Sequence, residues 1–158
     1  MSTTSSPSCL FCQIIHGERK SQVVFESEET LAFLDRRPLF PGHCLIVPKE
    51  HYATLLDLPE ALLRPLFSVA QLLARALEQG LGAEGSFVAV NNRISQSVPH
   101  LHIHVVPRRH KDGLKGFFWP RHAYADETER AAVAARIREL AARQRVPRAT
   151  LGFAARTV

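Results

Sequence analysis

The fold of this chain is decided by the stretch His100-Leu-His-Ile-His-Val-Val-Pro107. Histidine alternates with aliphatic residues, and a period of two is typical of a strand with one buried face. On such a strand His100, His102 and His104 share one face, and the aliphatic residues between them point into a core. Histidine titrates near neutrality, acts as a nucleophile and binds metals, so this face predicts a reactive site. A solvated strand face on which histidine recurs by chance is the alternative.

The bulk properties favour one ordinary globular domain. The chain has 158 residues, 46% hydrophobic and 22% charged, which is enough to bury a core. No run of 18 apolar residues is present, so we expect no membrane span. Three cysteines without a secretory signal favour a reducing, cytoplasmic interior over structural disulfides. The net charge of +5 is scattered without a nucleic-acid-binding motif, so nucleic acid is not an expected partner.

The order of predicted elements indicates an α+β domain with a meandering antiparallel five-stranded sheet. Strands are expected at residues 23–25, 30–34, 43–47, 87–90 and 100–106. A long helix is expected from Pro59 to Gln79, with Asp57 as its N-cap, Pro65 as a kink or first-turn residue, and Gly80 and Gly82 at its end. Its apolar stripe comprises Leu62, Leu63, Leu66, Phe67, Ala70, Leu73, Ala74 and Leu77.

The two ends of the chain differ from this central part in composition. Residues 1–8 are rich in Ser and Thr and are expected to form a disordered leader. Residues 111–158 are expected to form a basic loop, which carries Trp119, followed by a C-terminal helix. Asp126, with Glu129 three residues later, is predicted to cap that helix.

Several further blocks, taken with the histidine stretch, resemble the histidine-triad (HIT) superfamily. The family signature is His-φ-His-φ-His-φ-φ, where φ is apolar, and residues 100–106 fit it at all seven positions. The other matching blocks, in order, are Cys9–Ile15, Leu31–Asp35, Pro41–His43, Val47–His51, Val90–Asn91 and Gln96–Val98. The resemblance covers residues 9–110, which would be the HIT domain, and implies a nucleotide-binding α+β fold that forms a homodimer.

The resemblance also implies a two-step mechanism. His102 would attack the α-phosphorus of a nucleotide to give a nucleotidyl-histidine, which water then hydrolyses. His104 would hydrogen-bond the phosphate or the leaving oxygen, and His43 would complete the site from the adjoining strand. Flanking histidines that carry positive charge would keep His102 neutral and would stabilise the phosphoryl oxygens.

Substrate contacts are likewise implied by the resemblance. Asn91 and Ser97 would contact the phosphate or leaving group, Asp35 would accept bonds from the ribose hydroxyls, and Phe33, with Val24 and Leu45, would line a slot for the base. Asn, Ser and Asp also favour turns, which is the alternative for those three residues. The segment Asn91–Gln96 departs from the longer, Gly-rich phosphate loop of the family, so Arg93 is a candidate for an additional anion contact.

Cys9 and Cys12 have the C-x₂-C spacing of a zinc knuckle. Two cysteines do not close a tetrahedral site. The resemblance implies that His51 and His100 complete it, which would make the zinc structural. A redox pair or two unliganded thiols are the alternatives, and Cys44 is expected to be plain core. No organic cofactor is expected.

Two enzymatic activities and one binding activity are compatible with these residues. Hydrolysis of dinucleoside polyphosphates is favoured by Arg36-Arg37-Pro38 and by the basic stretch from Arg108 to Lys115, which could hold a polyphosphate. Hydrolysis of nucleoside phosphoramidates is the first alternative, suggested by the zinc knuckle and Phe33–Asp35. A non-catalytic nucleotide-binding or scaffold protein is the second, although such a protein would not require His102.

Overall fold

The computed structural model describes residues 8–114 and 122–144. The chain divides into two units, Met1–Leu114 and Lys115–Val158. Residues 1–7 of the expected leader (residues 1–8) and the loop segment with Trp119 lie outside the described residues. Within the described parts, no helix has the length and apolar character needed to cross a membrane.

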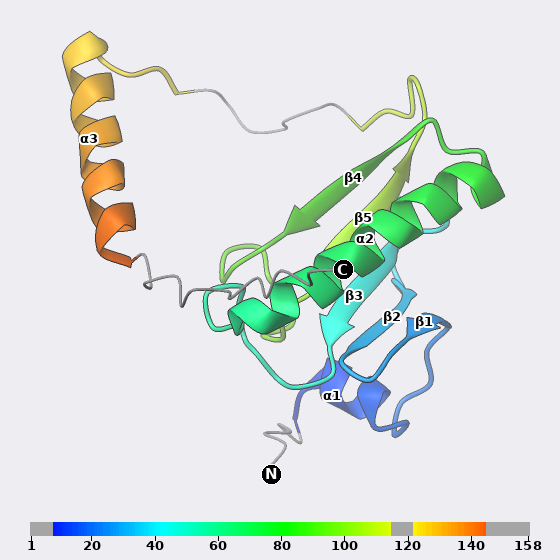
Figure 1. Ribbon diagram of the computed structural model, residues 1–158. Coiled ribbons are helices and arrows are strands. Elements are labelled where there is room, and N and C mark those ends of the chain that lie inside the picture. The colour runs from blue at the N-terminus through cyan, green and yellow to red at the C-terminus, as the bar shows by residue number, and fades with distance from the viewer. Residues whose placement is uncertain (1–7, 115–121, 145–158) are drawn as a thin grey trace, which may run out of the picture. The chain divides into compact units, whose positions relative to one another are not determined.

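The first unit is built on one antiparallel sheet of five strands, as the sequence predicts. The strands are β1 (Val23–Glu26), β2 (Thr30–Leu34), β3 (Cys44–Pro48), β4 (Gly85–Val90) and β5 (Ile103–Arg108). They lie side by side in the order β1-β2-β3-β5-β4, which leaves β1 and β4 at the edges (Figure 1). Neighbouring strands thus follow the order of the chain, except that β5 lies between β3 and β4.

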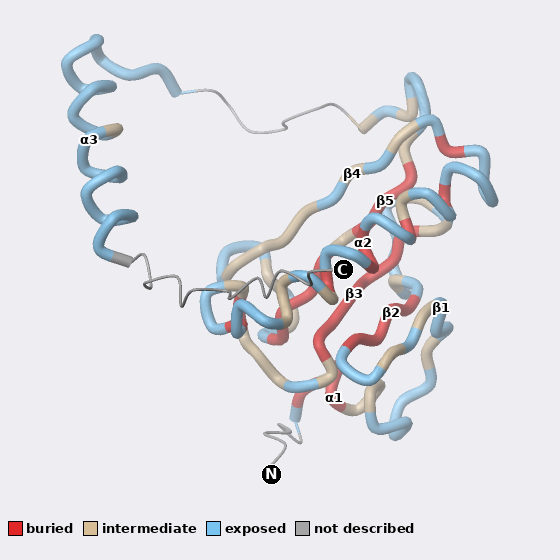
Figure 2. The backbone as a smooth tube through the Cα atoms, in the orientation of Figure 1, coloured by how far each residue is buried: buried red, intermediate tan, exposed pale blue. Residues whose placement is uncertain are grey.

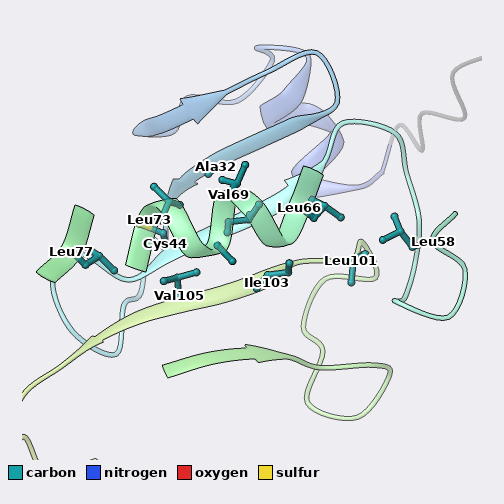
Figure 3. Packing of buried hydrophobic residues seen from close by; sticks show 12 residues of the cluster. Ala32, Cys44, Leu58, Leu66, Val69, Leu73, Leu77, Leu101, Ile103 and Val105 are labelled. Atoms are coloured by element: carbon teal, nitrogen blue, oxygen red, sulfur yellow. The ribbon is translucent and has the colours of Figure 1, made fainter. Parts of the chain in front are cut away.

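The long helix α2 (Glu60–Leu81) packs against one face of this sheet. Leu66, Val69 and Leu73 of the helix meet the inward-facing residues of β3 and β5 (Figure 3). Ile103 and Val105 are almost completely buried there, as the alternation in the sequence predicts. The helix ends at Gly82, whose φ of 62° is a left-handed conformation that glycine adopts without strain.

The opposite face of the sheet is covered at one end by the short helix α1 (Leu10–Ile15). Phe11 and Cys12 of this helix are buried together with Phe33, Leu45 and Val47 of the sheet. Figure 2 shows that burial is continuous along β3 and along β2 as far as Phe33, whereas the outer strand β1 is largely exposed. This second face carries the functional side chains described below.

Three local predictions differ from the structure. The fifth strand begins at Ile103 and not at His100, because Leu101 donates its N–H to the carbonyl of Tyr52 in a loop. Asp57 does not cap α2: its carboxylate accepts bonds from Thr54, and Pro59 occupies the N-cap position. Phe67, expected in the apolar stripe, is exposed.

The second unit contains the predicted C-terminal helix, α3 (Glu127–Gln144). Asp126 accepts a hydrogen bond from the N–H of Glu129 and so caps the helix as predicted, and Glu129 accepts one from the N–H of Ala125, just before the cap. Three of its arginines pair with glutamates one turn away, Arg130 with Glu127, and Arg136 and Arg143 with Glu139. Ion pairs one turn apart give a helix modest additional support.

Candidate active site and metal centre

The sheet register places the reactive histidines in rows on the face that α1 covers. Phe33 of β2 lies opposite Leu45 of β3, and Leu45 lies opposite His104 of β5. The side chains of these directly paired residues emerge on the same face. A row from Phe33 through Leu45 to His104 therefore runs across three strands, with an apolar floor at one end and an imidazole at the other.

A cavity of about 700 Å³ lies over this row. His102 and His104 line it at one end, together with Ser97, and Phe33 and Leu45 form part of its apolar lining. Helix α1 contributes a further wall. The volume is within the range of sites for small molecules, and its mixture of apolar and polar walls is typical of them.

The hydrogen bonds of His102 define which ring nitrogen is available for chemistry. Its Nδ1 lies 2.7 Å from the carbonyl oxygen of His100. A carbonyl only accepts, so Nδ1 carries the proton and Nε2 carries the lone pair. The ring of Phe11 packs edge-on against this imidazole, with 5.1 Å between the ring centroids. His102 is thus held in one orientation, with an unprotonated nitrogen, at the wall of the cavity.

A second chain of hydrogen bonds defines the tautomers of His43 and His104. The N–H of Leu39 donates to Nδ1 of His43 at 3.2 Å, so the proton of His43 is on Nε2. That Nε2 donates to Nδ1 of His104 at 2.9 Å, so the proton of His104 is also on Nε2. Nε2 of His104 is buried without a partner among the described residues. A buried donor of this kind is costly unless a ligand accepts from it.

All three histidines are favoured in the neutral form. Burial lowers the pKa of His43 and of His102 below the ordinary value, and only part of this is offset by the carboxylate of Asp35 and, at His102, by a backbone hydrogen bond. Burial, with His102 and His43 as neighbours, lowers the pKa of His104 to about 4. The sequence-based expectation of positively charged flanking histidines is therefore wrong: His102 is kept neutral by desolvation.

The structure places most, but not all, of the expected substrate-binding residues at this cavity. Asp35, Ser97 and Phe33 line it. Asp35 lies beside His43, with 3.6 Å between its Oδ2 and Nδ1, and its Oδ1 accepts from the N–H of Arg37. Asn91 is not among the lining residues; its Nδ2 lies 3.4 Å from the carbonyl oxygen of Ser95 within the 91–98 loop.

Two further expectations about substrate contacts are not met. Val24 is 44% exposed and does not line the cavity, because a bulge between Val23 and Phe25 interrupts the register of β1 at this residue. Arg93 does not line the cavity either, and its charge acts on Asp57, whose pKa is lowered mainly by hydrogen bonds from Thr54.

The arginines at and just after the end of β5 are held by other parts of the fold. Arg108 pairs with Asp112 at 2.6 Å, and its Nη2 also donates to the carbonyl of Leu114 at 2.5 Å. Arg109 donates to the carbonyl of Gly82 at 2.6 Å and to that of Leu81, at the C-terminal end of α2. These two arginines do not line the cavity. They therefore do not favour a polyphosphate substrate, in contrast to the prediction from the sequence.

Helix α1 contributes a wall of the cavity that sequence analysis missed. Leu10, Phe11 and Ile14 line the cavity, and Arg19 and Lys20 follow from the loop after the helix. The available signal was the apolar pattern of CLFCQII, which favours a helical turn or a zinc knuckle but does not by itself indicate the wall of a cavity. The short helix α1 thus contributes both to the wall of the cavity and to the group of expected metal ligands.

The four expected metal ligands come together next to the cavity. The ligand atoms of Cys9, Cys12, His51 and His100 all lie within 4.8 Å of one another. The distances from sulfur to imidazole Nδ1 are 3.5 Å for Cys9–His100, 3.3 Å for Cys12–His51 and 3.6 Å for Cys12–His100. Tetrahedral zinc, with bonds of about 2.3 Å to sulfur and 2.05 Å to nitrogen, requires about 3.6 Å between such atoms.

The orientation of His100 also fits a metal ligand. Its Nε2 donates to the carbonyl oxygen of Pro48 at 2.9 Å, which leaves the lone pair on Nδ1, facing both thiols. Burial lowers the pKa of His100 to about 4, which keeps this nitrogen unprotonated. A ligating histidine whose other nitrogen is fixed by a backbone carbonyl is the usual arrangement at zinc sites.

Comparison with known proteins agrees with this geometry. The HIT domain model matches residues 16–111. An adenylylsulfatase of Arabidopsis thaliana is 36% identical over 115 residues, which cover 72% of this chain and 58% of that protein. An adenosine 5′-monophosphoramidase of Candida albicans is 37% identical over 125 residues, 75% of this chain and 82% of that protein.

Solved structures extend the agreement to three dimensions. The crystal structure of a Zn-bound histidine triad family protein from Mycobacterium smegmatis is 37% identical, with a TM-score of 0.66 over 85% of this chain and 97% of that one. The domain model matches more than half of the present chain, including all three histidines of the 100–104 stretch. The chain therefore belongs to the histidine-triad (HIT) domain family of nucleotide hydrolases.

Proposed function

We propose that this protein cleaves nucleotides at the α-phosphate through a nucleotidyl intermediate on His102. The observation that carries the proposal is the pair of fixed tautomers at the cavity: His102 has a lone pair on Nε2, and His104 has an N–H on Nε2. A nucleophile and a hydrogen-bond donor on adjacent imidazoles, whose ring centroids are 4.9 Å apart, suit an attack on phosphorus.

The first step forms a bond from Nε2 of His102 to the α-phosphorus and breaks the bond from phosphorus to the leaving group, which departs with the electron pair. The proton stays on Nδ1 of His102 throughout and remains hydrogen-bonded to the carbonyl oxygen of His100. The N–H of His104 donates to a phosphoryl oxygen or to the leaving atom. In the second step water attacks phosphorus, the nitrogen–phosphorus bond breaks, and His102 regains its lone pair while solvent takes the proton.

For the leaving group, the sequence favours a polyphosphate, and dinucleoside polyphosphates are our first candidate substrates. The cavity suits an anionic ligand, because four cationic side chains line it against one carboxylate. Nucleoside phosphoramidates are the second candidate. They are favoured by the likeness to the Candida albicans monophosphoramidase, which covers 75% of this chain.

The metal cluster would hold a structural zinc through Cys9, Cys12, His51 and His100. The donor set and its distances fit this ion, and a Zn-bound relative has the same fold. Four protein ligands would close the coordination sphere, so the ion would supply rigidity to α1 and to the segment before β5. The histidines at the cavity would carry out the chemistry.

The homodimer expected from the resemblance remains a proposal of its own. Strand β4 is an edge strand with Val88 exposed, and an unpaired edge is available for pairing with a second copy. Light scattering on the purified protein would decide this, since a monomer at micromolar concentration would contradict it.

The proposed reaction is tested by quenching turnover with denaturant at alkaline pH, where the phosphorus–nitrogen bond survives, and measuring the mass of the peptide that contains His102. We expect an added nucleotidyl group with diadenosine polyphosphate or adenosine 5′-phosphoramidate as substrate, and the ratio of kcat/KM values ranks the two. Substrate consumption without the adduct under single-turnover conditions would refute the mechanism. Binding of nucleotide without turnover of either substrate would favour the non-catalytic alternative.

A further inference from the structure

Four cationic side chains line the cavity without an ion-pair partner. They are Arg19 and Lys20, from the loop after α1, and Arg36 and Arg37, from the loop after β2. Within residues 8–114, Lys49 pairs with Glu26 and Arg108 pairs with Asp112, but none of these four makes an ion pair. Asp35 is the only carboxylate among the lining residues. This excess of positive charge in a small-molecule cavity calls for an anionic group on the ligand.

The two cationic pairs lie at the same end of the cavity. The carbonyl of Gln22 accepts from the N–H of Leu34 at 2.9 Å, which fastens the loop after α1 beside the end of β2. Lys20 and Arg36 are each two residues from one member of this hydrogen bond. The four cations therefore come from two adjacent segments at the end of β2.

This end adjoins the histidines through Asp35, whose Oδ2 lies 3.6 Å from Nδ1 of His43, but the apolar floor at Phe33 is two strands away from His104. His104 is on β5 and Phe33 is on β2, with β3 between them. Two strand spacings of about 4.8 Å separate the two positions. A nucleotide with its phosphorus at His102 and His104, and its base over Phe33 and Leu45, would place its ribose beside Asp35 and the cations.

We propose that these cations recognise a second phosphoryl group, carried on the ribose of the nucleotidyl half of the substrate. The inference rests on the proposed function, and it names the substrate class: nucleotides phosphorylated on the 2′ or 3′ hydroxyl as well as at the 5′ position. Arginine suits this role, since its planar donors bind phosphate in a bidentate manner.

The hydrogen bonds of Asp35 are compatible with such a ribose. Its Oδ1 accepts from the N–H of Arg37 at 2.8 Å, so Oδ2 is the oxygen without a backbone donor. One remaining ribose hydroxyl donates to Oδ2, while the phosphoryl group on the other hydroxyl binds the arginines. A polyphosphate leaving group is the competing occupant, but it departs from phosphorus on the side opposite the attacking Nε2 of His102, and not towards the ribose.

The test compares ligands that differ only in the ribose phosphate. Binding of adenosine 5′-monophosphate, adenosine 3′,5′-bisphosphate and adenosine 2′,5′-bisphosphate is measured by calorimetry with the full chain. We expect one bisphosphate to bind at least about tenfold more tightly than the monophosphate, since each tenfold step requires only one good charge-assisted contact. The preference should fall as salt increases.

Two variants test whether Arg36 and Arg37 cause the preference for a bisphosphate. In R36Q/R37Q the ratio of bisphosphate to monophosphate affinity should fall to within about twofold of unity, because the bidentate donors are lost. Arg75→Gln is the matched control, since Arg75 is exposed on α2, which covers the opposite face of the sheet. The control should keep the ratio of the parent protein. Thermal unfolding of both variants establishes that they are folded.

The outcomes separate this inference from the proposed function. Equal affinity for the mono- and bisphosphates overturns the inference, and turnover of adenosine 5′-phosphoramidate in the same preparation leaves the function standing. A bisphosphate preference that R36Q/R37Q retains also overturns it. Loss of diadenosine polyphosphate turnover in R36Q/R37Q, with a ratio of unity in the parent protein, assigns the cations to the leaving group instead. A preference lost in R36Q/R37Q supports the inference even if the histidine adduct is never found.

Discussion

The metal cluster (Cys9, Cys12, His51 and His100) and the catalytic histidines (His43, His102 and His104) use the same imidazole ring in two ways. In both places a backbone carbonyl accepts a hydrogen bond from one ring nitrogen and leaves the other nitrogen available. The carbonyl of Pro48 accepts from Nε2 of His100, whereas the carbonyl of His100 accepts from Nδ1 of His102. His100 therefore presents Nδ1 to two thiols, and His102 presents Nε2 to the cavity.

This comparison teaches that the backbone acceptor, and not the spacing of the histidines, assigns each ring its role. The two places are also connected, because the carbonyl that orients His102 belongs to His100 itself. Phe11 adds a second connection: it lies between the two cysteines in sequence and packs on the ring of His102. Loss of a metal ligand should consequently alter the position of His102, whereas loss of the His102 side chain should leave the metal cluster intact.

Replacement of the nucleophile is expected to have the largest effect. His102→Ala should lower kcat by about 10⁴-fold or more, because removal of a nucleophile abolishes the covalent route. Metal content should be unchanged, since His102 is not among the clustered ligands. Steady-state kinetics and metal analysis check both points, with His110→Ala, at an exposed histidine, as the control. Equal turnover in His102→Ala and the parent protein would contradict the assigned role.

Removal of the metal is expected to have the next largest effect, and mainly on stability. An ion that binds only the folded protein, at about a thousandfold above its dissociation constant, stabilises it by about 4 kcal/mol. Cys12→Ser should lose the ion and unfold at lower denaturant concentration, and its remaining turnover should fall because Phe11 and His100 are less firmly held. Cys44→Ala, at a buried cysteine outside the cluster, should retain the metal. A parent protein purified without metal would refute the zinc proposal.

The comparison also shows which features the sequence could predict. The strands and α2 follow from short-range periodicity, and a buried face fixes the register of β2, β3 and β5 once the alternation is recognised. The grouping of Cys9, Cys12, His51 and His100 was implied by family resemblance, and the described residues bring these four together. Such features depend on local patterns or on motifs.

Other features depend on contacts between distant segments, and sequence analysis failed there. Arg109 is held by the end of α2, 27 residues away from Gly82, so its basic character did not indicate an anion site. The fifth strand begins late because Leu101 bonds to Tyr52 and not to a neighbouring strand. The tautomers of His43 and His104 follow from one backbone N–H of Leu39, which no side-chain pattern encodes.

A third prediction concerns His43, which acts through the N–H that it donates to His104. His43→Leu removes the N–H that bonds Nδ1 of His104, so His104 is free to take the other tautomer, which has no N–H at Nε2. We expect kcat to fall by about 10²-fold, the lower end of the range for acid–base groups. His43→Gln places an amide N–H near the same position and should recover most of the loss, with KM little changed. Equal losses in both variants would indicate a packing role for His43 only.

The smallest expected effect is on stability at acid pH, and it concerns the protonation of His104 at the cavity. The pKa of His104 is about 4 in the folded protein and near 6.5 when unfolded, so the unfolded chain binds more protons between these values. The stabilisation is complete above pH 6.5 and is lost progressively as the pH falls towards 4. One such group contributes a slope of at most about 1.4 kcal/mol per pH unit.

His104→Gln isolates this contribution, because glutamine does not titrate. The free energy of unfolding, measured with urea between pH 7.5 and 5 in metal-free buffer, should fall less steeply in the variant than in the parent protein, and the two slopes should agree above pH 7. Acid release of a metal would act on both proteins alike, so it cancels in the difference. Parallel curves over the whole range would mean that His104 is protonated equally in the folded and unfolded states, and the neutral donor assigned to it at the cavity would then be wrong.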